Sequence, residues 1–124
     1  MTATDANTAS ARILVAEDEF LVYLVLEDEL RAKGYNVLGP FGSLQATREA
    51  LAREHVDLVL LDINMGGSMA WPVADELIAR DIPFIFLSGY AEGTLPERYR
   101  EIPRIGKPYD PALLLGRIEH LLKR

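Results

Sequence analysis

Short apolar runs alternate with amphipathic stretches about five times along the chain. Two of the runs, Leu58 to Leu61 and Phe84 to Leu87, contain no alternating polar residue, which is typical of strands buried on both faces of a parallel sheet. We therefore predict an α/β fold with a doubly wound, five-stranded parallel sheet covered by helices on both faces. The predicted strands are Arg12 to Ala16, Tyr35 to Leu38, Leu58 to Leu61, Phe84 to Leu87 and Pro103 to Ile105.

Helical patterns with recognisable start and stop residues fill the segments between the strands. Gly34 is a typical helix stop, and Asp110 followed by Pro111 is a typical helix start. The predicted helices are Phe20 to Lys33, a helix capped by Ser43 that runs to about Glu54, Val73 to Arg80, and a last helix from Asp110 with Leu114, Ile118 and Leu121 on one face. The segment AEGTLPERYRE contains a Gly and a Pro, so we expect a short or mobile fourth helix.

The length and composition indicate one soluble domain. The 124 residues fit a single domain, for which we expect a disordered tail over residues 1–11 and a folded domain over 12–124. Hydrophobic residues make up 49% of the chain and charged residues 26%, as in globular proteins. The apolar runs are far shorter than the roughly 18 residues of a membrane span, so no membrane partner is expected.

The net charge and the cysteine content indicate which partners and which cellular compartment to expect. A net charge of −6 leaves no surplus of Lys and Arg to neutralise phosphates, so we expect no nucleic acid partner. The sequence contains no cysteine, and its first residues lack the pattern of a signal peptide. We therefore expect a cytoplasmic protein.

Chemically active side chains follow four of the five predicted strands. Glu17 and Asp18 follow the first strand, Asp62 the third, Ser88 the fourth, and Lys107 with Pro108 the fifth. Ligands bind at the carboxyl ends of such strands, and in a sheet of order 2-1-3-4-5 the first and third strands are neighbours there.

Three carboxylates would then converge, which is unfavourable unless a cation lies between them. Mg²⁺ suits such oxygen ligands. Asp62 could act as a nucleophile toward a phosphoryl group, with Lys107 neutralising its oxygens and Ser88 donating a hydrogen bond.

Each of these residues also has an ordinary structural explanation. The acidic run from Glu17 to Glu19 can begin a helix, where the helix dipole favours negative charge. Asp62 can begin a turn, Lys107 with Pro108 can be a solvated strand end, and Ser88 with Gly89 can be only a turn. The combination of all of them at one edge of one sheet is what indicates a functional site.

These residues give the chain a resemblance to the receiver domain of two-component response regulators over residues 12–123. The resemblance implies a flavodoxin-like fold with strand order 2-1-3-4-5. It also implies that Asp62 accepts a phosphoryl group from the phosphohistidine of a histidine kinase or histidine phosphotransfer protein. Mg²⁺ would be held by Asp18, Asp62 and the backbone carbonyl of Asn64, with Glu17 acting mostly through water, and the Lys107–Pro108 bond would be cis.

The same resemblance implies a bacterial signalling protein of a phosphorelay rather than an enzyme. With no room for an output domain in 124 residues, we expect it to signal through its own surface to a downstream protein. The run IPFIFLSGY is similar to the stand-alone subfamily nicknamed FATGUY, although Leu87 and Ser88 replace the usual Ala and Thr. Arg104 stands where the switch aromatic usually lies, so Ser88 and Tyr90 are the expected switch residues, unless Tyr90 only covers the crevice.

Two alternatives remain. A Mg²⁺-dependent phosphohydrolase of the haloacid-dehalogenase type would carry its nucleophile on the first strand in an Asp-x-Asp pattern, and a Toprim-like nuclease would need a second Asp where Asn64 stands. A receiver-like binding module that is never phosphorylated is the other alternative. The intact set of Asp18, Asp62, Ser88 and Lys107 favours the phosphoacceptor.

Overall fold

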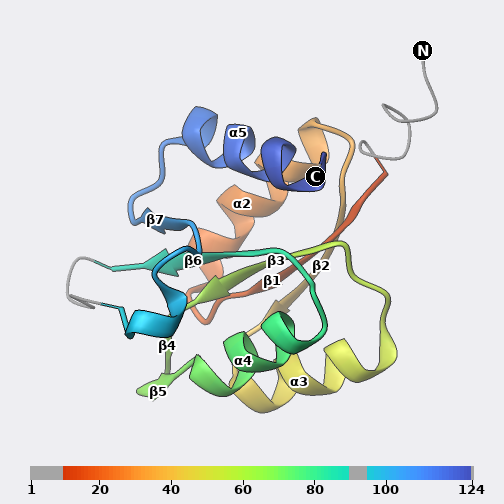
Figure 1. The fold of residues 1–124 in the computed structure, drawn as a ribbon. Coiled ribbons are helices and arrows are strands. Elements are labelled where there is room, and N and C mark those ends of the chain that lie inside the picture. The colour runs from red at the N-terminus through yellow and green to blue at the C-terminus, as the bar shows by residue number, and fades with distance from the viewer. Residues whose placement is uncertain (1–9, 90–94, 124) are drawn as a thin grey trace.

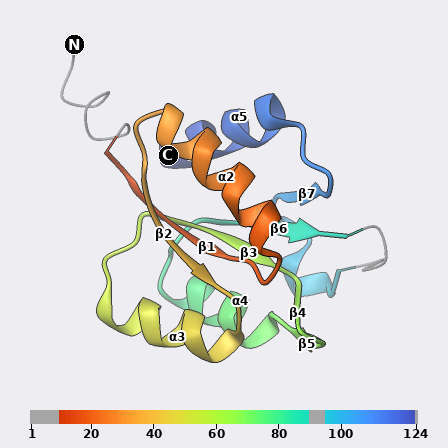
Figure 2. The ribbon, with the colours of Figure 1, turned by 180° about the vertical axis from the view of Figure 1, so that it is seen from behind.

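The computed structural model describes residues 10–89 and 95–123, which are coloured in Figures 1 and 2. Five parallel strands form one sheet in the order β2-β1-β3-β6-β7, and the short strands β4 and β5 form a separate hairpin. Because β6 and β7 are the fourth and fifth strands of the large sheet, this is the predicted order 2-1-3-4-5. The strands are β1 (Arg12–Ala16), β2 (Asn36–Phe41), β3 (Leu58–Asp62), β4 (Asn64–Met65), β5 (Ser68–Met69), β6 (Phe84–Ser88) and β7 (Arg104–Gly106).

Two helices cover each face of the sheet. Helices α2 (Phe20–Ala32) and α5 (Pro111–Leu122) lie above it in Figure 1, and α3 (Leu44–Arg53) and α4 (Trp71–Ala79) lie below it. Every residue of β3 and β6 is buried, because each strand alternates its side chains between the two helical layers. The prediction of two-sided burial for these strands is therefore confirmed.

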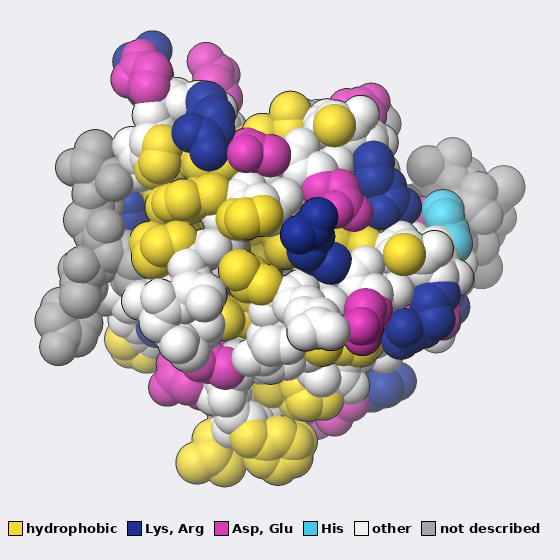
Figure 3. Space-filling model, turned by 90° about the horizontal axis from the view of Figure 1, so that it is seen from below, with side chains coloured by type: hydrophobic (Ala, Val, Ile, Leu, Met, Phe, Trp, Pro, Cys, Tyr) yellow, Lys and Arg dark blue, Asp and Glu magenta, His cyan; other side chains and the backbone are white. Residues whose placement is uncertain are grey.

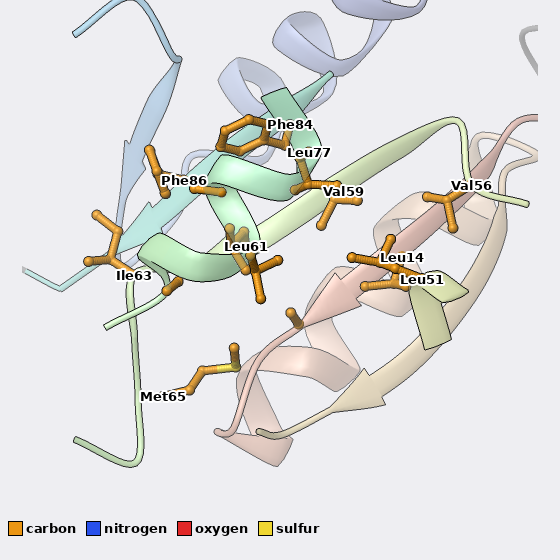
Figure 4. Packing of buried hydrophobic residues seen from close by; sticks show 14 of the residues in the cluster. Leu14, Leu51, Val56, Val59, Leu61, Ile63, Met65, Leu77, Phe84 and Phe86 are labelled. Carbon is orange, nitrogen blue, oxygen red and sulfur yellow. The ribbon is translucent and has the colours of Figure 1, made fainter. Parts of the chain in front are cut away.

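Each layer has its own hydrophobic cluster. Figure 4 shows the lower one, to which Leu61 and Phe86 of the sheet, Leu51 of α3 and Leu77 of α4 all contribute. The upper cluster joins the other faces of the same strands to α2 and α5, and Leu114, Ile118 and Leu121 share its α5 side as predicted. On the outer surface under α3 and α4, hydrophobic side chains are interrupted by Lys, Arg, Asp and Glu (Figure 3).

The predicted helix boundaries follow real caps. The Ser43 hydroxyl accepts a hydrogen bond from the backbone N–H of Ala46 at 3.1 Å. Asp110 does the same for Ala112 at 3.1 Å, with Pro111 as the first helical residue. Gly34 ends α2 with a φ of 90°. No helix in the described parts of the chain is long and apolar enough to cross a membrane.

The second strand differs from its prediction, because it continues past Leu38 to Phe41 through a cis Gly39–Pro40 bond. A proline is tolerated because β2 is an edge strand, whose outer side needs no donor. Only glycine fits at position 39, since φ is +144° and a Cβ would lie 2.8 Å from the carbonyl oxygen of Val15. The extension matters for function, because the carbonyl of Phe41 accepts a hydrogen bond from the N–H of Glu17 at 3.0 Å.

Other boundaries moved by smaller amounts. Helix α4 begins at Trp71 rather than Val73, because Pro72 is compatible with the first turn of a helix. The residues around Gly66 and Gly67 form the β4–β5 hairpin, in which Asn64 pairs with Met69.

Two predicted segments, the N-terminal tail and the fourth crossover, are only partly described by the structure. Of the expected tail, Ala11 is buried and its carbonyl accepts the N–H of Asn36 at 3.0 Å, so the ordered domain includes it; the expectation for residues 1–9 stays a prediction. In the fourth crossover, residues 90–94 lie outside the description, and the described part forms only the 3-10 turn η2 (Glu97–Tyr99). A short helical element there agrees with the prediction.

Candidate functional site

The strand register brings the predicted residues to one edge of the sheet. Ala16 of β1 pairs with Leu61 of β3, so the residues that follow each of them are neighbours. Asp62 pairs with Leu87 of β6, the residue before Ser88. Finally, Ser88 pairs with Gly106 of β7, and its carbonyl accepts the N–H of Lys107 at 2.8 Å. Positions 17, 62, 88 and 107 therefore converge.

Four carboxylates meet at this edge. One oxygen each of Glu17, Asp18, Glu19 and Asp62 lies within 4.8 Å of all the others. Glu17 is 1% exposed and Asp62 is 2% exposed, whereas Asp18 and Glu19 face solvent. We call these four residues the carboxylate cluster.

Lys107 extends its ammonium group into the carboxylate cluster. Its Nζ donates to Asp62 Oδ2 at 3.2 Å, to Glu19 Oε1 at 2.9 Å and to Glu17 Oε2 at 3.1 Å. Burial by itself lowers the pKa of Lys107, but the hydrogen bonds to Glu17 and Glu19 and the charge of Asp62 outweigh it and raise the pKa overall. Lys107 is therefore positively charged at any ordinary pH.

The cluster holds more negative charge than one ammonium can balance. Burial raises the pKa of Asp62 to about 8, and the hydrogen bond and charge of Glu17 add to this effect, while Lys107 opposes it. Glu17 Oε1 forms an ion pair with Lys107 Nζ at 2.7 Å, and this buried oxygen has no hydrogen-bond partner among the described residues.

A buried carboxylate oxygen that lacks a hydrogen bond and lies among other carboxylates fits a hard divalent cation, which takes oxygen ligands and relieves the repulsion. Asp18, Asp62 and Glu17 are the side chains that could hold Mg²⁺ here. Asn64 begins β4 two residues beyond Asp62, and its N–H donates a hydrogen bond to Asp62 Oδ1 at 3.3 Å. The role of the Asn64 backbone carbonyl as a ligand stays a prediction.

The β4–β5 hairpin is fastened to the cluster through its tip. The N–H of Gly66 donates to Asp18 Oδ2 at 3.1 Å, and the N–H of Gly67 donates to Asn64 Oδ1 at 2.9 Å. Both glycines have positive φ values, of 61° and 91°, which L side chains rarely adopt. Asp18 is thus held toward the cluster by the hairpin.

Of the remaining predicted site residues, the structure describes Ser88 and Pro108 but not Tyr90. Ser88 is buried at the end of β6, and the Lys107–Pro108 bond is cis, as expected. The Ser88 hydroxyl accepts a hydrogen bond from Arg104 Nε at 3.1 Å. Tyr90, the expected switch aromatic, lies outside the described residues.

Three features of the site were not predicted from the sequence. Glu19 occupies the N-cap position of α2 but makes no side-chain capping bond, because its carboxylate pairs with Lys107. The hydroxyl of Tyr109 is buried without a partner among the described residues, and burial raises its pKa, with the charge of Glu17 acting in the same direction. The spacing of Tyr109, two residues beyond Lys107, is the only signal that could have placed it here. The third feature that was not predicted is the hydrogen bond from Arg104 to Ser88.

The geometry agrees with what comparison with known families shows. The family model described as the response regulator receiver domain matches residues 13–119. The chain therefore belongs to the response regulator receiver domain family, which is a signalling family.

Similar proteins come from several bacteria. The transcriptional regulatory protein PdtaR of Mycobacterium tuberculosis is 32% identical over 98% of this chain and 62% of that protein. RprY of Bacteroides fragilis is 34% identical over 91% of this chain and 50% of that protein. The chain thus spans roughly half to three fifths of the length of these relatives.

Solved structures give the same fold. The solution structure of SdrG from Sphingomonas melonis Fr1 superimposes with a TM-score of 0.81 at 31% identity, covering 94% of this chain and 98% of that chain. The receiver domain of PhyR from Erythrobacter litoralis gives 0.80 at 30% identity, with 92% and 91% covered.

Proposed function

We propose that this domain is a phosphoacceptor, in which Asp62 takes a phosphoryl group from a phosphohistidine in a Mg²⁺-dependent reaction. The observation that carries the proposal is the position of Asp62. Its buried carboxylate ends a central strand, 3.2 Å from the ammonium of Lys107 and within the carboxylate cluster. Membership of the receiver family supports the same conclusion.

The residues of the site suit each part of the transfer. A carboxylate oxygen of Asp62 attacks the phosphorus, the new O–P bond forms, and the P–N bond breaks with its electron pair returning to the imidazole. Lys107 then offsets the negative charge of the phosphoryl oxygens, and the Ser88 hydroxyl donates a hydrogen bond to one of them. Asp18, Asp62, the Asn64 carbonyl and, through water, Glu17 would hold Mg²⁺, which would supply further charge neutralisation.

The surface beside the site supports a protein as the phosphoryl donor. Helix α2 starts next to the cluster and exposes Phe20, Leu21 and Val25, with Leu21 77% exposed. Between α2 and the start of α5 lies a pocket lined by Val25, Pro108 and other mostly apolar residues. A histidine kinase or a histidine phosphotransfer protein in the cytoplasm is the partner we propose, and the phosphorylated domain would act on a downstream protein.

Intact-mass measurement tests the proposal directly. Wild-type protein incubated with acetyl phosphate and Mg²⁺ should gain the mass of one phosphoryl group, and chelation of the metal should prevent the gain. The Asp62→Asn variant should gain none. Asp28→Asn, which changes an exposed carboxylate outside the cluster, is the matched control and should behave as wild type.

Two other results would favour the alternatives. Repeated turnover of a phosphomonoester that depends on Asp62 would indicate a phosphohydrolase. No mass gain with small donors or with phosphorylated histidine kinases would contradict the phosphoacceptor and leave a receiver-like binding module.

A further inference from the structure

The Ser88 hydroxyl is held by a side chain from the neighbouring strand. Arg104, the first residue of β7, donates from Nε to Ser88 Oγ at 3.1 Å. Ser88 itself is 3% exposed, whereas Arg104 lies at the surface. The bond therefore runs from an exposed, charged side chain to a buried hydroxyl at the edge of the phosphoryl site.

The sheet register makes this contact possible. Arg104 pairs with Phe86 and Gly106 pairs with Ser88, so Arg104 lies two residues back along β7 on the same face as Ser88. Gly106 has no side chain, and a Cβ built there would find its nearest neighbour, the Ser88 carbonyl oxygen, only at 4.0 Å. Nothing on the paired residue therefore separates Arg104 from the hydroxyl.

The chemistry of the two groups fixes the direction of the hydrogen bond. A guanidinium has only donors and does not lose its charge in proteins, so Ser88 Oγ can only accept from it. A serine hydroxyl has one hydrogen to donate and two lone pairs. While Oγ accepts from Arg104, its hydrogen stays available for another acceptor, and donating groups in such a chain polarise one another.

We propose that Arg104 is a positioning residue that acts through Ser88. It holds Oγ as an acceptor, so that the hydroxyl hydrogen points to a phosphoryl oxygen on Asp62. Phosphoryl oxygens only accept hydrogen bonds, so the chain Arg104 to Ser88 to phosphoryl group has one consistent direction. This inference rests on the proposed phosphoacceptor function of Asp62, and it adds a residue that carries the presence of the phosphoryl group to the surface of β7.

A double-mutant cycle separates an action through Ser88 from an independent effect of charge. The variants are Arg104→Met, which keeps an apolar stem but removes the donors, Ser88→Ala, and the two combined. The quantity measured is the rate of Asp62 phosphorylation by acetyl phosphate with Mg²⁺, followed by intact mass. Arg104→Met and Ser88→Ala should each slow the reaction about three- to tenfold, as expected for one lost hydrogen bond, and the double variant should be no slower than Ser88→Ala.

Two controls accompany the cycle. Arg100→Met removes another exposed arginine, paired with Glu97 at 3.1 Å, and should leave the rate unchanged. Arg104→Lys keeps a donor-only cation and should recover part of the rate. If Arg104→Met reacts as fast as wild type, or if the two single effects multiply in the double variant, Arg104 does not act through Ser88 and the inference is wrong.

The nitrogen NMR signal of the Arg104 Nε–H gives a second test that needs no variant of Arg104. It should shift in Ser88→Ala and shift again when beryllium fluoride and Mg²⁺ form the phosphoryl mimic on wild-type Asp62. A signal unmoved in Ser88→Ala would overturn the inference without any phosphorylation. Absence of phosphorylation in wild type would instead contradict the proposed function, and the inference would fall with it.

Discussion

At the scale of single residues, the site is a problem of charge. The ammonium of Lys107 contacts Glu17, Glu19 and Asp62, and Asp18 lies in the same carboxylate cluster. Because two of these carboxylates are almost fully buried, their repulsion is screened poorly by water. The repulsion between these carboxylates therefore lowers the free energy of unfolding of the metal-free domain.

The first prediction concerns how the free energy of unfolding depends on pH. Since the folded protein raises the pKa of Asp62 from 3.8 to about 8, the folded state binds the proton more tightly than the unfolded chain does. The contribution to stability is therefore favourable at low pH and is lost as the pH rises from about 4 through 8. In a chelator, wild-type protein should lose unfolding free energy between pH 5.5 and 8.

Asp62→Asn should lack this part of the pH dependence and should be more stable than wild type at pH 8, by about 1–3 kcal/mol. Urea unfolding with a chelator at both pH values measures the difference. Asp28→Asn, exposed and outside the carboxylate cluster, should keep the wild-type slope. Equal pH slopes for Asp62→Asn and wild type would show that Asp62 is ionised normally in the metal-free fold.

The second prediction concerns the ammonium group of Lys107 in the carboxylate cluster. Lys107→Met leaves the buried Glu17 and Asp62 without their positive partner, so it should lower the unfolding free energy by about 2–4 kcal/mol at pH 8. In an Asp62→Asn background the same change should cost clearly less, because one of the two buried charges is gone. Urea unfolding of the four proteins measures this coupling, and strictly additive losses would contradict the ion-pair account.

At the scale of elements, Tyr99 fastens the fourth crossover to α4. Its side chain is fully buried, and its hydroxyl lies 2.5 Å from Asp75 Oδ1. The ring stacks on Trp71 with centroids 5.0 Å apart and meets Phe86 edge-on at 5.6 Å. Burial raises the pKa of Tyr99 to about 12, so the hydroxyl remains a donor at neutral pH.

The third prediction separates the hydroxyl of Tyr99 from its ring. Tyr99→Phe removes only the hydroxyl, with its hydrogen bonds to Asp75 and to the Trp71 carbonyl, and should lower the unfolding free energy by about 1 kcal/mol. Tyr99→Ala also removes the packing against Trp71 and Phe86 and should cost about 3–5 kcal/mol. Arg98→Met changes only an exposed ion pair to Asp75 and a contact over the Tyr99 ring, so it should cost less than either. Thermal unfolding ranks the three variants by stability. Equal losses for Tyr99→Phe and Tyr99→Ala would show that packing of the ring does not stabilise the fold.

Local signals in the sequence predicted much of the fold but not the packing of Tyr99. The strand order, the caps Ser43 and Asp110, and the convergence of Asp62 with Lys107 were predictable, because apolar runs and cap residues are local signals and parallel strands end at one edge. Tyr99 gave no such signal, because its burial depends on residues far along the chain.

For the same reason the side-chain contacts within the site were missed. Glu19 looked like a helix-capping residue, and only the folded position of Lys107 draws its carboxylate away. The bond from Arg104 to Ser88 likewise depends on the register of β6 and β7. The extension of β2 past Leu38 was hidden by Gly39 and Pro40, which usually end a strand, and which are tolerated here at the sheet edge.

At the scale of the whole molecule, the site exists only when the sheet is complete. Glu17, Asp62 and Lys107 come from strand ends that are far apart in the sequence and adjacent in the fold. The unfolded chain holds no such cluster, so a cation that binds it favours the folded state. Binding of a metal ion to the cluster would therefore be linked to global stability.

The last prediction follows from this linkage. A ligand that binds only the folded state stabilises it by RT ln(1 + [L]/Kd), which is about 1.4 kcal/mol at a free concentration ten times Kd. Mg²⁺ should therefore raise the unfolding midpoint of wild-type protein in a concentration-dependent manner. Asp18→Asn should remove most of the effect, because Asp18 is the exposed carboxylate that the Gly66 N–H holds in the cluster. Asp28→Asn should respond as wild type, and an equal response of Asp18→Asn would show that the stabilising ion binds elsewhere on the domain.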